Sequence, residues 1–146
     1  MASSTFSGPI KSGTVREGAS VNTGYAVLSQ SYDSGDLAGD TIGNYDVVQG
    51  RIPAGAQILD IVVDQVVAAT TGTTTVSVGT ASGGAQLMAA VATTNGGRFR
   101  GTATAATQLA WQLSTTADTT VYVRNVVGTD TLGAGRFIVT VIYAQK

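Results

Sequence analysis

Short apolar runs separated by clusters of Gly, Ser, Thr and Asn dominate this chain. The runs are rich in Val, Ile, Thr and Tyr, and no long amphipathic helix pattern interrupts them. Such spacing is typical of an antiparallel β-sandwich or barrel, so we predict an all-β fold. The predicted strands cover residues 25–31, 44–51, 57–67, 74–79, 98–102, 107–113, 120–127 and 135–144.

One apolar segment of ambiguous secondary structure and several turns lie between the predicted strands. The stretch AQLMAAV at residues 85–91 fits either a short helix or a strand, because periodicity cannot decide at that length. Turn residues cluster at 53–55 (PAG), 70–73 (TTGT), 82–84 (SGG) and 95–97 (NGG).

The first 24 residues differ from the rest of the chain. They are rich in Gly, Ser and Thr and show no core pattern. We expect residues 1–24 to form an extended N-terminal arm and residues 25–146 a single sandwich domain. Such an arm either frays or becomes ordered on a neighbouring subunit.

Two predicted strands have unusual faces. In residues 57–67, alternation places Leu59, Ile61, Val63, Gln65 and Val67 toward the core. The other face then carries Ile58, Asp60, Val62, Asp64 and Val66. In residues 135–144, both faces are largely apolar. An arm, a loop or another subunit would cover the outer face, or the strand is buried at the centre of the domain.

Composition narrows the function. Charged residues make up 12% of the 146 residues, the net charge is −1, and neither His nor Cys is present. This balance argues against an electrostatic nucleic-acid binder, and the missing side chains remove most catalytic triads and zinc sites. Because no apolar stretch reaches about 18 residues and no secretion signal is visible, we expect no membrane span and a soluble protein that is made and assembled in a cytoplasm.

Asp60 and Asp64 are not a catalytic pair. Four residues along a strand separate them by about 13 Å, whereas glycosidase carboxylates lie about 5–9.5 Å apart. They cannot share a cation either. We interpret them as charges that fix strand register or pair with arginine across an interface.

Other candidate groups each have a plain structural alternative. Asp33, Asp36, Asp40, Asn44 and Asp46 lie in a Gly-rich segment that is either a Ca²⁺ loop or a solvated connection. Arg98 and Arg100 share one strand face, where they either point to solvent or clamp an acidic partner. Trp111, with Leu109 and Leu113, fits core packing better than a sugar platform.

The chain resembles small structural proteins of tailed-bacteriophage virions, in particular capsid decoration or cement proteins. The segments that carry the resemblance are STFSGPIKSGTVREG, NTGYAVLSQS, IPAGAQILDIVVDQV and GAGRFIVTVIYAQ. The resemblance implies a jelly-roll-like sandwich that assembles as a homotrimer on the outer capsid surface and clamps capsomers of the major capsid protein. A neck or tail component is not distinguished from a cement protein.

The resulting expectation is a virion protein without catalytic residues, cofactor or metal. We expect the partner-binding residues to be Lys11, Arg16, Asp60, Asp64, Arg98 and Arg100. A carbohydrate-binding sandwich of an adhesion device remains the alternative, and it would use Trp111 and the segment from Asp33 to Asp46. A carboxylate-only enzyme would need two acids that converge from different segments, such as Asp46 and Asp118.

Overall fold

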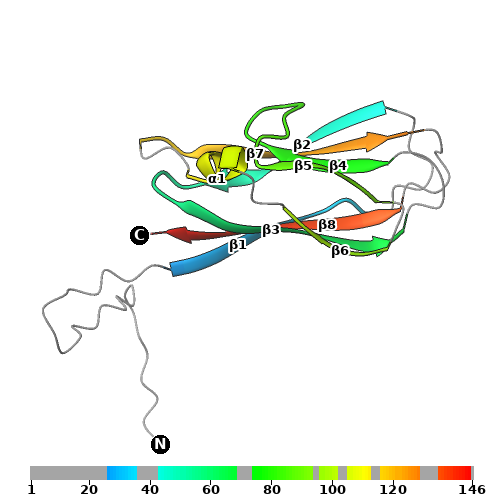
Figure 1. Cartoon of the computed structure of the whole chain (residues 1–146), viewed down its shortest axis with the longest axis horizontal. Helices are drawn as coiled ribbons and strands as arrows, with labels where there is room; N and C mark the ends of the chain where they lie inside the picture. The colour runs from blue at the N-terminus through cyan, green and yellow to red at the C-terminus, as the bar shows by residue number, and fades with distance from the viewer. Residues whose placement is uncertain are drawn as a thin grey trace, which may run out of the picture.

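Two four-stranded antiparallel sheets form the body of the protein (Figure 1). The computed structural model describes residues 26–35, 43–68, 74–93, 96–101, 105–112, 116–128 and 135–145. In spatial order the first sheet contains β1 (Ala26–Asp33), β8 (Arg136–Gln145), β3 (Gln57–Val67) and β6 (Gly97–Arg100). The second contains β2 (Gly43–Ile52), β7 (Thr119–Val127), β4 (Thr75–Gly79) and β5 (Met88–Ala92).

The strand order is that of a jelly roll. Successive strands cross from one sheet to the other, except that β4 and β5 are neighbours in the second sheet. The strand orders β1-β8-β3-β6 and β2-β7-β4-β5 are what two interleaved Greek keys produce. The predicted all-β sandwich and its jelly-roll-like form are therefore confirmed.

The core lies between the two layers. Phe137, Val139, Val141 and Tyr143, which alternate along β8, are buried. Alternate residues of β7 face them from the second sheet, including Val121 and Val123. The outer face of β8 is half-buried, because β8 is an inner strand with β1 and β3 on either side.

Two irregularities in β3 overturn part of its predicted face assignment. Pairing with β8 shifts register between Ile58 and Asp60, and again between Gln65 and Val67. A bulge of one residue turns the following side chains to the opposite face. Ile58 is therefore buried, whereas Leu59 and Val67 are exposed, the reverse of the prediction for all three. Between the bulges the prediction holds, since Ile61, Val63 and Gln65 face the core.

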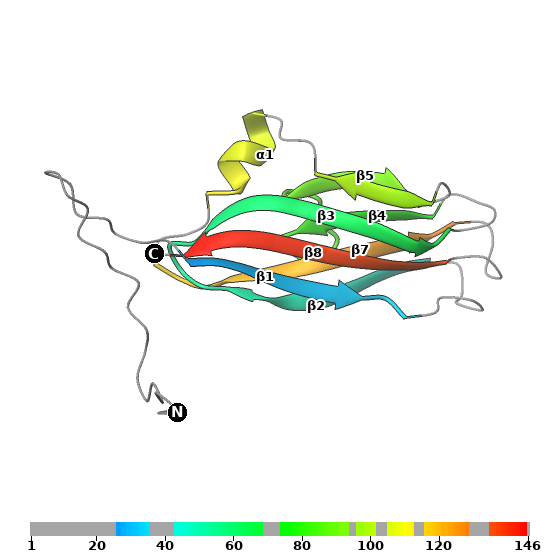
Figure 2. The same ribbon diagram turned by 90° about the horizontal axis from the view of Figure 1, so that it is seen from below.

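Residues 107–113 were predicted as a strand, and this was wrong. The structure has a helix, α1 (Ala105–Ala110), whose Ala-, Gln- and Leu-rich sequence favours helix. Figure 2 shows α1 projecting beside the sheets. The ambiguous segment 85–91 resolves as a strand from Met88 onward, and it pairs with β4 through Val76 and Val91.

Turn chemistry is confirmed at two sites. Gly55 has φ of +79° and Ala56 N–H donates to the Pro53 carbonyl at 3.2 Å. Gly83 has φ of +76°, in the left-handed region that glycine tolerates best. Residues 70–73, Asn95 and the predicted arm at 1–24 lie outside the described residues. No helix in the described part of the chain is long and apolar enough to span a membrane.

Candidate interaction surface

The outer face of the β1-β8-β3-β6 sheet brings four of the predicted site residues together. Arg98 lies directly opposite Asp64 in the β3–β6 pairing. Its guanidinium donates two hydrogen bonds to that carboxylate, from Nε to Oδ1 at 2.6 Å and from Nη2 to Oδ2 at 3.1 Å. Arg100 Nη1 lies 3.2 Å from Asp60 Oδ2. The two aspartates thus pair with separate arginines, which agrees with the register-fixing role inferred for them.

These arginines remain available to a partner. The side chains of Arg98 and Arg100 are 63% and 66% exposed, respectively. The hydrogen bonds that Arg98 donates to the Asp64 carboxylate raise the pKa of Arg98 above its ordinary value, because they favour the charged guanidinium. Each arginine has five N–H donors, so one carboxylate leaves donors on its exposed side unused.

A third ion pair lies on the same face, between β1 and β8. Arg136 forms a two-pronged pair with Asp33, and its Nε–Oδ1 distance is 3.0 Å. The hydrogen bonds from Arg136, together with one from the Gly35 backbone N–H, lower the pKa of Asp33 to about 2. This pair was not predicted, because the residues are more than 100 positions apart in the sequence and the pairing of β1 with β8 had no local signal.

An apolar strip separates these charges. Ile138, Thr140 and Ile142 of β8 are half-buried on this face, and Val62 of β3 is 6% exposed. Val62, Thr140 and Ile142 line a shallow hollow of about 190 Å³, together with Asp64, Arg98 and Arg100. We call this combination of apolar strip and flanking ion pairs the outer sheet face.

The two edge strands that lie next to each other on one side of the sandwich, β1 and β2, carry further exposed aliphatic side chains (Figure 2). Val27, Leu28 and Val48 are 63%, 42% and 54% exposed. Side-chain amides join the two strands, since Gln30 Nε2 donates to the Arg51 carbonyl and Gln49 Nε2 donates to the Gln30 carbonyl, both at 2.8 Å. Sequence reasoning missed this edge, because its apolar residues look like ordinary core positions until the strand order is known.

Trp111 belongs to the core rather than to a sugar platform. Its ring packs against the buried cluster, and its indole N–H donates to the Leu87 carbonyl at 2.8 Å. That much was predicted. Leu109, which was expected to share its face, is 72% exposed on α1, and Leu113 lies outside the described residues.

The proposed calcium loop gains no support from the residues that can be placed. Asp33 is engaged by Arg136, and Asp46 accepts a hydrogen bond from Ser82 Oγ at 3.1 Å. Asp36 and Asp40 lie outside the described residues, as do Lys11 and Arg16. Among the described residues, no three acidic, His or Cys side chains gather as metal ligands would.

Comparison with known proteins adds two structural neighbours. No family model and no curated protein sequence matches the chain. A chain in the capsid asymmetric unit of cyanophage Pam1 superposes with a TM-score of 0.56 and 19% sequence identity, covering 91% of this chain and 94% of that one. A chain from the capsid of Ralstonia phage GP4 gives a TM-score of 0.53 and 19% identity, covering 94% and 92%.

These neighbours share the fold of this chain over nearly its whole length. The resemblance to phage virion structural proteins, first suggested by the sequence, is therefore confirmed at the level of fold.

Proposed function

We propose that this protein is a structural component of a tailed-phage virion that binds the outer surface of the capsid. In this role it clamps neighbouring capsomers of the major capsid protein and so stabilises the shell. The observation that carries the proposal is the near-complete overlap with chains from two phage capsids, which spans more than 90% of each chain. We place it in the virion as a non-enzymatic part.

The outer sheet face supports contact with a shell protein. Protein interfaces commonly combine an apolar centre with a polar rim, and here an apolar strip on β8 lies between three ion pairs. The three aspartates and three arginines balance to zero net charge. A partner is therefore recognised by the arrangement of these charges rather than by their sum.

The apolar edge supports self-association, and we propose a homotrimer. Exposed aliphatic side chains on two adjacent edge strands are costly in a monomer and favour pairing with another chain. We further propose that the arm at residues 1–24, through Lys11 and Arg16, reaches a neighbouring subunit. Linking several modest contacts raises avidity, because each further contact forms at an effective concentration of roughly mM.

Charge variants of the outer sheet face test the proposal. The double variant Arg98→Ala with Arg100→Ala changes the net charge of the three ion pairs on the outer sheet face from zero to −2. Two of the three arginines are lost while the three aspartates remain. If the arginines meet acidic groups of the shell, affinity in a co-sedimentation assay with undecorated shells falls about tenfold at low salt, and the loss shrinks as salt is added.

The matched control breaks the same two ion pairs by removing the aspartates instead of the arginines, so the net charge of the face changes in the opposite direction. Asp60→Asn with Asp64→Asn leaves the arginines free, so the proposal predicts equal or tighter binding to the shell. Equal weakening by both double variants would show that the pairs act only through the fold. Wild-type protein that never sediments with shells would refute shell binding itself, and selective binding to tails or necks would move the protein to that part of the virion.

A further inference from the structure

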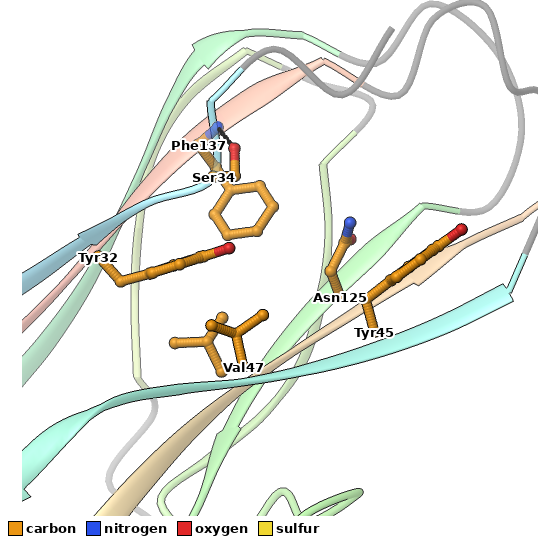
Figure 3. A pocket seen from close by; sticks show the side chains of 7 residues that line it. Tyr32, Ser34, Tyr45, Val47, Asn125 and Phe137 are labelled. Atoms are coloured by element: carbon orange, nitrogen blue, oxygen red, sulfur yellow. Dashed lines mark hydrogen bonds between the residues drawn. The ribbon is translucent and has the colours of Figure 1, made fainter. Parts of the chain in front are cut away.

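A cavity opens between the two sheets, away from the outer sheet face. It has a volume of about 270 Å³ and lies between β1 and β8 of one sheet and β2 and β7 of the other. Figure 3 shows Tyr32 and Phe137 reaching in from one layer and Val47 and Asn125 from the other. Its lining is Tyr32, Ser34, Tyr45, Val47, Val123, Asn125 and Phe137.

This lining is aromatic and uncharged. Three of its residues carry aromatic rings, and the rings of Tyr32 and Phe137 are tilted by 53° with centroids 6.3 Å apart. No charged side chain is among the seven lining residues. An ionic ligand would therefore lose its hydration without gaining a counter-charge.

Asn125 makes the cavity more than a packing gap. It occupies an inward position of β7, where Val121, Val123 and Val127 are its equivalents. Asn125 is 6% exposed, and its side-chain Oδ1 has no hydrogen-bond partner. Leaving a buried acceptor unpaired costs about 1–3 kcal/mol, so such a group calls for an explanation.

Ser34, another polar residue of the cavity lining, does not pair with Asn125 Oδ1. Ser34 Oγ already accepts from the Phe137 backbone N–H at 3.0 Å and donates to the Gly35 carbonyl at 3.0 Å. That serine fixes the junction of β1 with β8, whereas the Asn125 amide faces the cavity with hydrogen-bonding capacity to spare.

We propose that this cavity binds a small neutral ligand with an apolar ring face and hydroxyl groups, namely a single neutral sugar residue. Aromatic rings pack against the C–H face of such a ring, and a hydroxyl both donates and accepts, so it complements the amide of Asn125 in either orientation. The volume is just below the range of about 300–1,000 Å³ that suits drug-sized ligands, which favours one ring.

This inference is independent of the proposed shell binding. A hydrocarbon ligand would leave Asn125 unpaired, and an anion would find no cation among the lining residues. Trp111 is committed to the core, so the candidate sugar contact in this protein is the cavity around Asn125 rather than Trp111.

The test is an NMR titration of the isotope-labelled full chain with glucose, galactose, mannose and N-acetylglucosamine. At millimolar sugar, where weak single-ring ligands bind, at least one of these is expected to shift the Asn125 side-chain amide and the Tyr32 and Phe137 ring signals. Asn125→Leu removes the amide signal itself and should abolish the shifts of the Tyr32 and Phe137 ring signals. Gln57→Leu, which replaces an exposed side-chain amide on β3 outside the cavity lining, should leave them unchanged.

A second variant protects the test against misfolding of the first. Val47→Phe fills the cavity from β2 without altering Asn125, and it should also abolish the shifts. The proposal is overturned if none of the four sugars shifts these signals, or if the shifts persist in both cavity variants. It is likewise overturned if a crystal grown with the sugars shows water alone on Asn125. Shell co-sedimentation should be the same for wild type and Asn125→Leu, so failure here leaves the proposed function standing.

Discussion

At the scale of single residues, the aspartates of β3 show which properties of a site the sequence can predict and which it cannot. Strand geometry alone separates Asp60 from Asp64 by about 13 Å and so excludes a catalytic dyad. Their actual partners, Arg100 and Arg98, could not be predicted with the same certainty. That pairing depends on β6 lying beside β3, which is a long-range property of the fold rather than a property of either segment.

Asp33 gives a pH prediction at this scale. Its pKa is about 2 in the folded protein, below the ordinary 3.8, so the carboxyl stays ionised in the fold after the unfolded chain has taken up a proton. The Arg136 pair therefore contributes stability above a pH of about 3.8 that is lost as pH falls toward 2. Asp33→Asn should flatten the fall in Tm between these pH values.

Thermal melts of wild type, Asp33→Asn, Arg136→Gln and the double variant across that pH range check the prediction. Each single variant should show the flatter profile, and the double variant should add little, because both changes remove one interaction. Parallel Tm profiles for wild type and Asp33→Asn would contradict the assignment.

At the scale of elements, periodicity succeeded where a strand is long and regular. The bounds of β3 were predicted as the structure has them, whereas the two apolar faces of β8 gave no prediction of which one faces the core. The failures have local causes. One-residue bulges exchanged the faces of Ile58 and Leu59, and α1 was taken for a strand because a short apolar run fits both periods.

Two leucines test the position of α1 and its surroundings. Leu87 is fully buried and its carbonyl accepts a hydrogen bond from the Trp111 indole N–H, whereas Leu109 is exposed on α1. Leu87→Ala should lower the free energy of unfolding by about 2–5 kcal/mol, since it leaves a cavity. Leu109→Ala should change it by less than about 0.5 kcal/mol, because the side chain is exposed and Ala favours helix.

Urea denaturation of the two variants measures both effects. A loss for Leu109→Ala as large as that for Leu87→Ala would mean that α1 packs through Leu109, as the predicted strand required. It would then contradict the helix placement.

At the scale of the whole molecule, the fold class followed from composition and turn spacing, but the strand order did not. An alternating apolar pattern predicts a sandwich or a barrel equally well, and the jelly-roll order appears only when distant strands are paired. The same limit applies to function. The outer sheet face, the β1–β2 edge and the Asn125 cavity all join residues from segments that are far apart in the sequence.

The central claim is that this jelly roll decorates the outside of a phage shell. Its most direct test is cryo-electron microscopy of shells assembled from the major capsid protein of the same phage, with and without this protein added. The account predicts additional ordered density on the outer surface that fits the two-sheet body. Shells that stay bare, or density confined to the inner surface or to a tail vertex, would contradict it.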